Sequence, residues 1–169
     1  MDYLFEKMSS YNIINYMLPG VAFSMLSKNW LGYDFISENI LLELFIVYFI
    51  GIVISRISSI IIEPLLKKIK FIKFAPYEDY VKQERKNQKL KILNEQNNMF
   101  RTLFTTMTLL ALLKLYQFIS IRFCFFQYNY IILIISLLVL FLFSYRKQTD
   151  FIRRRVEINK GEDHETGSI

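Results

Sequence analysis

The stretch "FIGIVISRISSIIIEPLLKKIKFIKFAPY", residues 49–77, decides how this chain folds. It is an apolar run that contains Arg56 and Glu63, meets a proline at Pro64, and continues into a basic segment. A helix needs about 20 predominantly apolar residues to cross the hydrocarbon core of a bilayer. The stretch therefore predicts a membrane helix that carries two charged side chains near one end and lysines beyond it.

The composition favours a membrane protein over a soluble domain. Of the 169 residues, 53% are hydrophobic and 17% are aromatic, which is more apolar than an ordinary soluble domain of this size. No repeat and no linker rich in glycine, serine or proline divides the sequence. We therefore expect one all-α integral membrane domain over residues 1–150 and a polar cytoplasmic tail over residues 151–169.

Four segments can serve as transmembrane helices. Residues 8–27 and 123–145 are uncharged and long enough, so they predict the first and fourth crossings. The uncharged parts of the two central segments are too short at a rise of about 1.5 Å per residue. They reach membrane length only as residues 39–62 and 102–121, which include ionisable side chains at Glu43, Arg56 and Lys114.

The lysine and arginine positions predict the orientation, because the cytoplasmic loops of membrane proteins are enriched in both. With both termini inside, a basic helical loop over residues 64–101 and the basic tail lie in the cytoplasm, and only Lys28 and Arg122 fall in outer loops. We therefore predict four transmembrane helices with both termini in the cytoplasm. Within the first helix, Pro19 and Gly20 predict a kink or a break and argue against a signal peptide.

Arg56, Ser59 and Glu63 lie within two turns of one predicted helix and share a face. Two interpretations remain open. The side chains form an interfacial ion pair that positions the helix, or they form a polar stripe that faces a bundle interior or a water-filled cavity. Pro64 follows directly, and because proline has no amide hydrogen to donate, we expect the helix to end or bend there.

The segment after Pro64 is expected to lie on the inner leaflet as an amphipathic stretch. Its lysines would reach lipid phosphates while its apolar side chains enter the acyl boundary. The positive-inside rule accounts for the same charges, so direct nucleic-acid binding is the less favoured explanation. The candidate residues for binding anionic lipid or a partner are Lys67, Lys68, Lys70 and Lys73, with Arg153, Arg154 and Arg155 in the tail.

Glu43 and Lys114 lie at compatible depths in the two central helices. We expect them to form an ion pair, because two uncompensated charges near lipid cost more free energy than one desolvated pair. The alternative is that each side chain extends separately to the outer surface.

The third crossing is expected to continue a cytoplasmic helix. On that helix Glu95, Asn98 and Arg101 are spaced to form a polar cluster at the membrane surface. Threonines extend the polar face into the membrane, where they either line a pore or bond to carbonyls of their own helix. These are Thr102, Thr105 and Thr106.

The sequence offers little for enzymatic chemistry. Cys124 is the only cysteine and His164 the only histidine, and the histidine lies in a polar stretch, residues 159–169, that we expect to be disordered. Motifs of zinc proteases, P-loop enzymes, dinucleotide-binding proteins and serine hydrolases are absent from the sequence. We expect no enzyme activity, no cofactor and no metal site.

Three stretches carry a resemblance to known proteins: "YNIINYMLPGVAF" (11–23), "IIEPLLKKIKFIKFAPYEDYV" (61–81) and "NEQNNMFRT" (94–102). Together they resemble small multi-pass membrane proteins encoded in bacterial phage-defence loci, and they are similar to the membrane accessory proteins of type VI-B CRISPR loci. The resemblance implies a defence-linked inner-membrane protein that perturbs the membrane or supports a cytosolic effector. It carries over no set of functional residues.

Three functional hypotheses follow. The first is an effector or accessory protein that acts as a homo-oligomer and perturbs or permeabilises the inner membrane through the polar faces of its second and third helices. The second is a non-catalytic scaffold that recruits a cytosolic partner through its basic face. The third is a small solute or ion transporter with a site among Glu43, Arg56 and Lys114.

Overall fold

The structure is a computed structural model that describes residues 2–35, 38–120 and 129–166. Every secondary-structure element in these ranges is a helix, so the all-α class is confirmed for this part of the chain. By length and composition, two of the described helical stretches could cross a membrane, Ile40–Lys68 and Lys89–Ile119. Both overlap the central crossings predicted from the sequence.

The helices are longer than the predicted crossings. In chain order they are α1 (Asp2–Leu31), α2 (Ile40–Ile57), the π-helical turn η1 (Ser58–Ile62), α3 (Glu63–Lys68), α4 (Tyr77–Lys86), α5 (Gln88–Ser120) and α6 (Asn129–Thr166). The predicted cytoplasmic helix and third crossing form one continuous helix, α5. The first residues of the predicted fourth crossing, 123–128, lie outside the described ranges.

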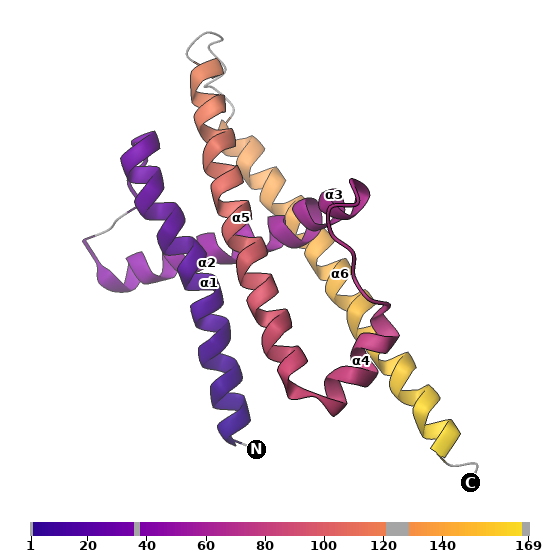
Figure 1. Ribbon diagram of the computed structural model, residues 1–169. Helices are drawn as coiled ribbons and strands as arrows, with labels where there is room; N and C mark the ends of the chain where they lie inside the picture. Colours follow the sequence, from indigo (N-terminus) through magenta and orange to yellow (C-terminus); the bar gives the residue numbers. More distant parts are fainter. Residues whose placement is uncertain (1, 36–37, 121–128, 167–169) are drawn as a thin grey trace.

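The long helices do not form an up-and-down bundle. α1, α5 and α6 run along the length of the molecule, while α2 lies across them and contacts all three (Figure 1). α2 begins after Asn39, whose side-chain oxygen accepts hydrogen bonds from the amides of Leu41 and Leu42. The two termini lie at the same end of the molecule (Figure 1).

Two glycines allow α2 to cross α1 at very short range. A Cβ atom built on Gly20 would lie 2.0 Å from the Val47 carbonyl oxygen, and one built on Gly51 would lie 1.8 Å from the Tyr16 carbonyl oxygen. The two backbones are therefore in direct contact, as in membrane helix pairs joined by small residues. Of the predicted kink or break at Pro19–Gly20, the break is wrong, because α1 continues through both residues. Gly20 serves as the crossing point.

The core lies where α1, α2 and α5 meet. Its buried side chains are Phe23, Leu31, Ile54 and Leu110. Large apolar side chains remain exposed on the outer faces of the long helices, among them Leu41, Phe45, Phe118, Leu138 and Leu142. Apolar surface spread over several helices is unusual for a soluble monomer and is the kind that a bilayer covers.

The helix around Pro64 does not end at that residue. It continues from α2 through η1 into α3 and ends at Lys68. Lys70 adopts a left-handed conformation with φ of 59°, and the amides of Lys70 and Phe71 bond to the carbonyls of Lys67 and Leu66. This arrangement is a Schellman helix end, so the predicted amphipathic stretch is a short helix followed by a turn and an extended segment.

The tail is more ordered than its composition suggested. The prediction of disorder is wrong for residues 159–166, because α6 continues to Thr166. In the turns of α6 just before residue 159, Arg153 pairs with Asp150 at 4.0 Å and with Glu157 at 3.7 Å. Ion pairs one turn apart stabilise a solvated helix by a few tenths of a kcal/mol each, about 0.2–0.5.

The glycine crossing gives a prediction. Gly51→Ala places a methyl group against the Tyr16 carbonyl, so the helices must separate, and we expect the free energy of unfolding to fall by about 1–3 kcal/mol. Thermal unfolding in detergent, followed by the fluorescence of Trp30, measures this. Leu41→Phe, which adds bulk on the exposed face of α2, is the control. Equal stability of Gly51→Ala and the native chain would contradict the direct backbone contact.

Candidate functional site

A buried carboxylate joins three helices. Glu63 in α3 is only 8% exposed. Its Oε2 atom pairs with Nη1 of Arg101 in α5, and its Oε1 atom lies 2.8 Å from Nζ of Lys67, one turn further along the chain. Nζ of Lys147 in α6 lies 3.9 Å from the same Oε1 atom. We call these four side chains the Glu63 network.

The π-helical turn before Glu63 has a physical cause in Pro64. The Glu63 amide donates to the Ser58 carbonyl, five residues back. At the same spacing the Ser59 carbonyl would accept from residue 64, but proline has no amide hydrogen. Nζ of Lys147 fills this position, because it donates to both the carbonyl and the hydroxyl oxygen of Ser59. The carbonyl that Pro64 leaves without a backbone donor thus attaches α6 to η1.

The cations of the network make further contacts. Nε of Arg101 donates to the hydroxyl of buried Ser58 at 3.0 Å. Nζ of Lys147 lies 5.9 Å from the centre of the Phe151 ring, close enough for a cation–π interaction. Burial lowers the pKa of Lys147 below its ordinary value, although the nearby Glu63 carboxylate favours the charged form. The contacts with Ser58 and Phe151 hold Arg101 and Lys147, respectively, beside the Glu63 carboxylate.

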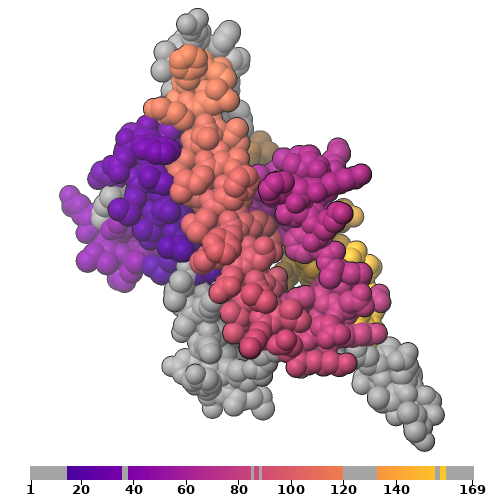
Figure 2. Space-filling view, viewed as in Figure 1, coloured from indigo at the N-terminus to yellow at the C-terminus, as the bar shows by residue number. Residues whose placement is uncertain are grey.

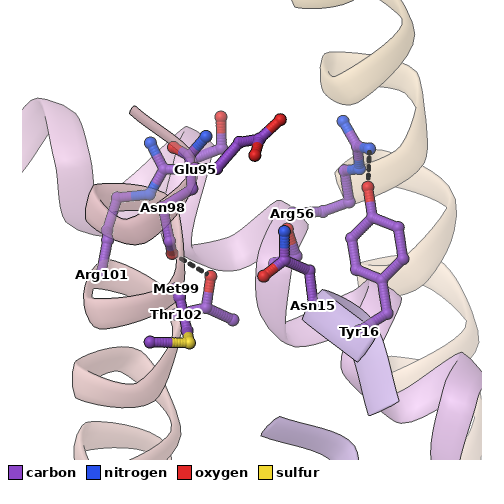
Figure 3. Close-up of a pocket in the computed structure, with 10 residues that line it drawn as sticks. Asn15, Tyr16, Arg56, Glu95, Asn98, Met99, Arg101 and Thr102 are labelled. Carbon is purple, nitrogen blue, oxygen red and sulfur yellow. Dashed lines mark hydrogen bonds between the residues drawn. The ribbon is translucent and has the colours of Figure 1, made fainter. Parts of the chain in front are cut away.

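A polar cavity of about 220 Å³ lies beside the network, between α1, α2 and α5 (Figure 3). Arg56 projects from α2 and donates from Nη2 to the Tyr16 hydroxyl at 3.4 Å. The predicted polar cluster lines the α5 side of this cavity with Glu95, Asn98 and Arg101 (Figure 3). The cavity therefore brings together two arginines, the Glu95 carboxylate and several neutral polar groups.

The predicted stripe of Arg56, Ser59 and Glu63 is divided between two environments. Arg56 and Ser59 line the polar cavity, whereas Glu63 pairs with Arg101 and two lysines. Ser59 contacts both environments, because Lys147 of the Glu63 network also donates to it. The expectation of an ion pair within the stripe is wrong, because the π-helical turn inserts an extra residue between the two groups and rotates Glu63 away from Arg56. The cavity interpretation holds for the first two residues only.

The threonines of α5 face the protein interior. Thr102, Thr105 and Thr106 are buried, and each hydroxyl donates to the carbonyl four residues earlier in α5. Thr102 also lines the polar cavity. The interpretation as back-bonded threonines is therefore confirmed. Thr105 and Thr106 have no exposed surface in this arrangement and line no open path.

The predicted ion pair between Glu43 and Lys114 is wrong. Nζ of Lys114 donates to the Trp30 carbonyl at 2.8 Å, and the Gln117 amide donates to the Leu31 carbonyl at 2.7 Å. These carbonyls belong to the last residues of α1, which have no donor within their own helix, and a cation there also suits the helix dipole. Glu43 lies instead in the first turn of α2. A transporter site among Glu43, Arg56 and Lys114 is therefore not assembled.

The candidate lipid-binding residues differ in their surroundings. Lys68, Lys70 and Lys73 are exposed, whereas Nζ of Lys67 belongs to the Glu63 network and lies 4.2 Å from the centre of the Phe74 ring. In α6, Arg153 is held in ion pairs and Arg154 is exposed. The side chain of Arg155 lies outside the described residues.

The expected absence of metal chemistry is tested only in part. Among the described residues, no group of three histidine, cysteine, aspartate or glutamate side chains could hold a metal ion. Cys124 lies outside the described ranges. His164 lies in α6, but its side chain is not described.

No family model, no curated protein and no solved structure matches this chain. What the fold and site define is an all-helical protein with two helices that could span a membrane and a buried charge network that joins α3, α5 and α6.

Sequence reasoning missed three of the side chains that build the site. From the sequence, Lys147 is one basic residue among several after the fourth predicted crossing, Ser58 does not differ from its neighbours, and Tyr16 belongs to an uncharged span. A signal for the first was present. A proline inside an apolar helix leaves an upstream carbonyl without its donor, and a cation on another helix is a suitable replacement.

The network gives a second prediction. Glu63→Ala leaves Arg101, Lys67 and Lys147 close together without their counter-charge, so we expect the free energy of unfolding to fall by about 2–3 kcal/mol, reduced from the usual cost of breaking a buried pair because two of the cations are partly exposed. Detergent unfolding measures the loss. Glu78→Ala, at an exposed carboxylate of α4, should cost less than about 1 kcal/mol. Similar losses in both variants would refute the central role of Glu63.

Proposed function

We propose that this chain is a four-span inner-membrane protein with both termini in the cytoplasm. Support comes from the uncharged segments at residues 8–27 and 123–145, from the two described helices that could span a membrane, and from the position of both termini at one end of the molecule. Membrane helices are tilted by about 0–40° from the bilayer normal. Because α2 lies across the other helices, this topology requires α2 to be strongly tilted.

Within that topology we propose that the protein is a non-catalytic accessory of a bacterial anti-phage defence system. It would act at the cytoplasmic surface, where its basic face engages anionic lipid and a cytosolic effector. The observation that carries the proposal is the division of charge around α3. The Glu63 network secures the helices, whereas Lys68, Lys70 and Lys73 remain exposed just beyond it. Exposed lysines next to a membrane helix are typical of contacts with anionic surfaces.

A second candidate is an oligomeric effector that permeabilises the membrane. The polar cavity favours it, because Arg56, Asn98 and Thr102 lie between helices that also carry extensive apolar surface. Polar groups inside a membrane protein commonly mark a path for ions or solutes. This candidate ranks second because Thr105 and Thr106, two of the three threonines expected to line a pore, are packed inside the monomer.

The topology is tested by labelling single cysteines with a membrane-impermeant maleimide, in a Cys124→Ser background. We expect Tyr33→Cys to react in intact cells, since it precedes α2 on the outer side, and Lys70→Cys to react only after the cells are permeabilised. Both positions are exposed, so accessibility within the protein does not limit either reaction. Labelling of both positions only after permeabilisation would show that α2 does not cross the membrane.

The function is tested in bacteria that express the native chain or the triple variant Lys68→Gln, Lys70→Gln, Lys73→Gln. Phage plating efficiency and membrane potential, read with a voltage-sensitive dye, are followed with and without phage. We expect the native chain to lower plating without depolarising uninfected or infected cells, and the triple variant to lose that protection. The matched control neutralises Lys82, Lys86 and Lys89, exposed lysines of α4 and α5.

The outcomes separate the candidates. Depolarisation by the native chain during phage challenge would move the assignment to the permeabilising effector, with Arg56→Ala expected to abolish it. Equal protection by the triple variant and its control would refute a role for the basic face.

A further inference from the structure

A second hollow lies between α3, α4, α5 and α6 and has a volume of about 440 Å³. It shares Arg101 with the polar cavity. The segment that contains α3 stands out beside α5 in the space-filling view (Figure 2) and forms one wall of this hollow. We call the hollow the basic hollow, and its charged lining residues are Lys67, Arg101, Lys147, Arg154 and Glu63.

The charges in the basic hollow do not balance. Four cations line it against a single carboxylate, and that carboxylate already binds Arg101 through one oxygen and Lys67 through the other. Lys147, at 3.9 Å, adds a third cation to the same group. Cations gathered in a partly desolvated hollow repel one another unless an anion offsets them. The lining therefore lacks negative charge.

Hydrogen-bond donors remain for such an anion. A guanidinium group has five N–H donors in a planar fork, and the described contacts of Arg101 use Nε for Ser58 and Nη1 for Glu63. Each lysine ammonium has three donors; Lys67 uses one of them for Glu63, and Lys147 uses two for Ser59. Arg154 adds a second guanidinium group at the exposed margin of the hollow. Arginine forks combined with lysine point charges suit phosphate oxygens in particular.

Aromatic rings form the rest of the wall. Tyr77 from α4 and Phe151 from α6 lie with their ring centres 5.7 Å apart, and Phe74 lies beneath Lys67. All three line the hollow. Phe74 and Phe151 are partly exposed, so the rings shield the cations from water on one side only. Even partial loss of water strengthens the attraction between the cations and an anion.

We propose that the basic hollow binds a phosphate group through Arg154, Lys67, Lys147 and the remaining donors of Arg101. The phosphate belongs either to the headgroup of an anionic lipid or to a soluble phosphate compound. Exposed Leu65, Ile69 and Phe71 near the α3 wall provide apolar surface for acyl chains, which favours the lipid source. The lipid source rests on the proposed membrane placement, whereas phosphate recognition does not.

The test uses Arg154→Gln, because Arg154 lies outside the Glu63 network. Arg153→Gln is the matched control, since it removes the same charge from the adjacent residue of α6, where Arg153 pairs with Asp150 and Glu157. In one arm, purified protein in detergent is titrated with inorganic phosphate at constant ionic strength, and thermal unfolding is measured. In the other arm, protein in phosphatidylcholine nanodiscs is compared with protein in nanodiscs that also contain phosphatidic acid.

We expect phosphate or phosphatidic acid to raise the unfolding temperature of the native chain and of Arg153→Gln. Arg154→Gln should need about five- to tenfold more ligand for the same shift, the loss expected for one charge-assisted hydrogen bond. A shift with phosphatidic acid alone assigns the lipid source, and a shift with inorganic phosphate assigns the soluble source. Absence of a shift, or equal responses of the two arginine variants, overturns the site. Failure of the membrane topology would appear in the cysteine labelling and leave the detergent arm interpretable.

Discussion

The rest of the structure depends on the neutralisation of one buried carboxylate. Glu63 lies in a helix apolar enough to cross a membrane, and an ionised group in such a place costs several kcal/mol unless it is paired, on the order of the penalties found for buried ions in proteins. Arg101, Lys67 and Lys147 pair with it from α5, α3 and α6. The need to neutralise Glu63 thus sets the relative positions of α3, α5 and α6.

Pro64 leads to a second connection between this region and α6. Proline has no amide hydrogen, and at the spacing of the π-helical turn the carbonyl left without a backbone donor is that of Ser59. Lys147 donates the missing hydrogen bond to this carbonyl. The turn also presents Ser58 to Arg101 on α5. Neighbouring serines therefore contact two different helices, Ser58 through Arg101 of α5 and Ser59 through Lys147 of α6.

The crossing of α1 and α2 explains how two cavities come to lie beside one another. Because Gly20 and Gly51 let the backbones touch, Tyr16 of α1 reaches Arg56 of α2 and closes one side of the polar cavity. On the other side of the network, α4 and α6 enclose the basic hollow. Arg101 lines both cavities, so a ligand in the basic hollow would act on a side chain that also borders the polar cavity. This shared arginine links the proposed phosphate site to the cavity between α1, α2 and α5.

The sequence by itself determined the helical class, the two central helices that could span a membrane, the continuity of α5 and the position of the basic segment, because apolar length and helical spacing are local properties. It also placed Glu95, Asn98 and Arg101 on one face of α5. Only the tertiary structure decided which groups on different helices contact one another. Lys114 bonds to the end of α1 because α1 extends to Leu31, Glu63 finds Arg101 because a π-helical turn rotates it, and α2 lies across the other helices because two distant glycines meet. Each of these contacts joins residues far apart in the chain, so no local pattern contains them.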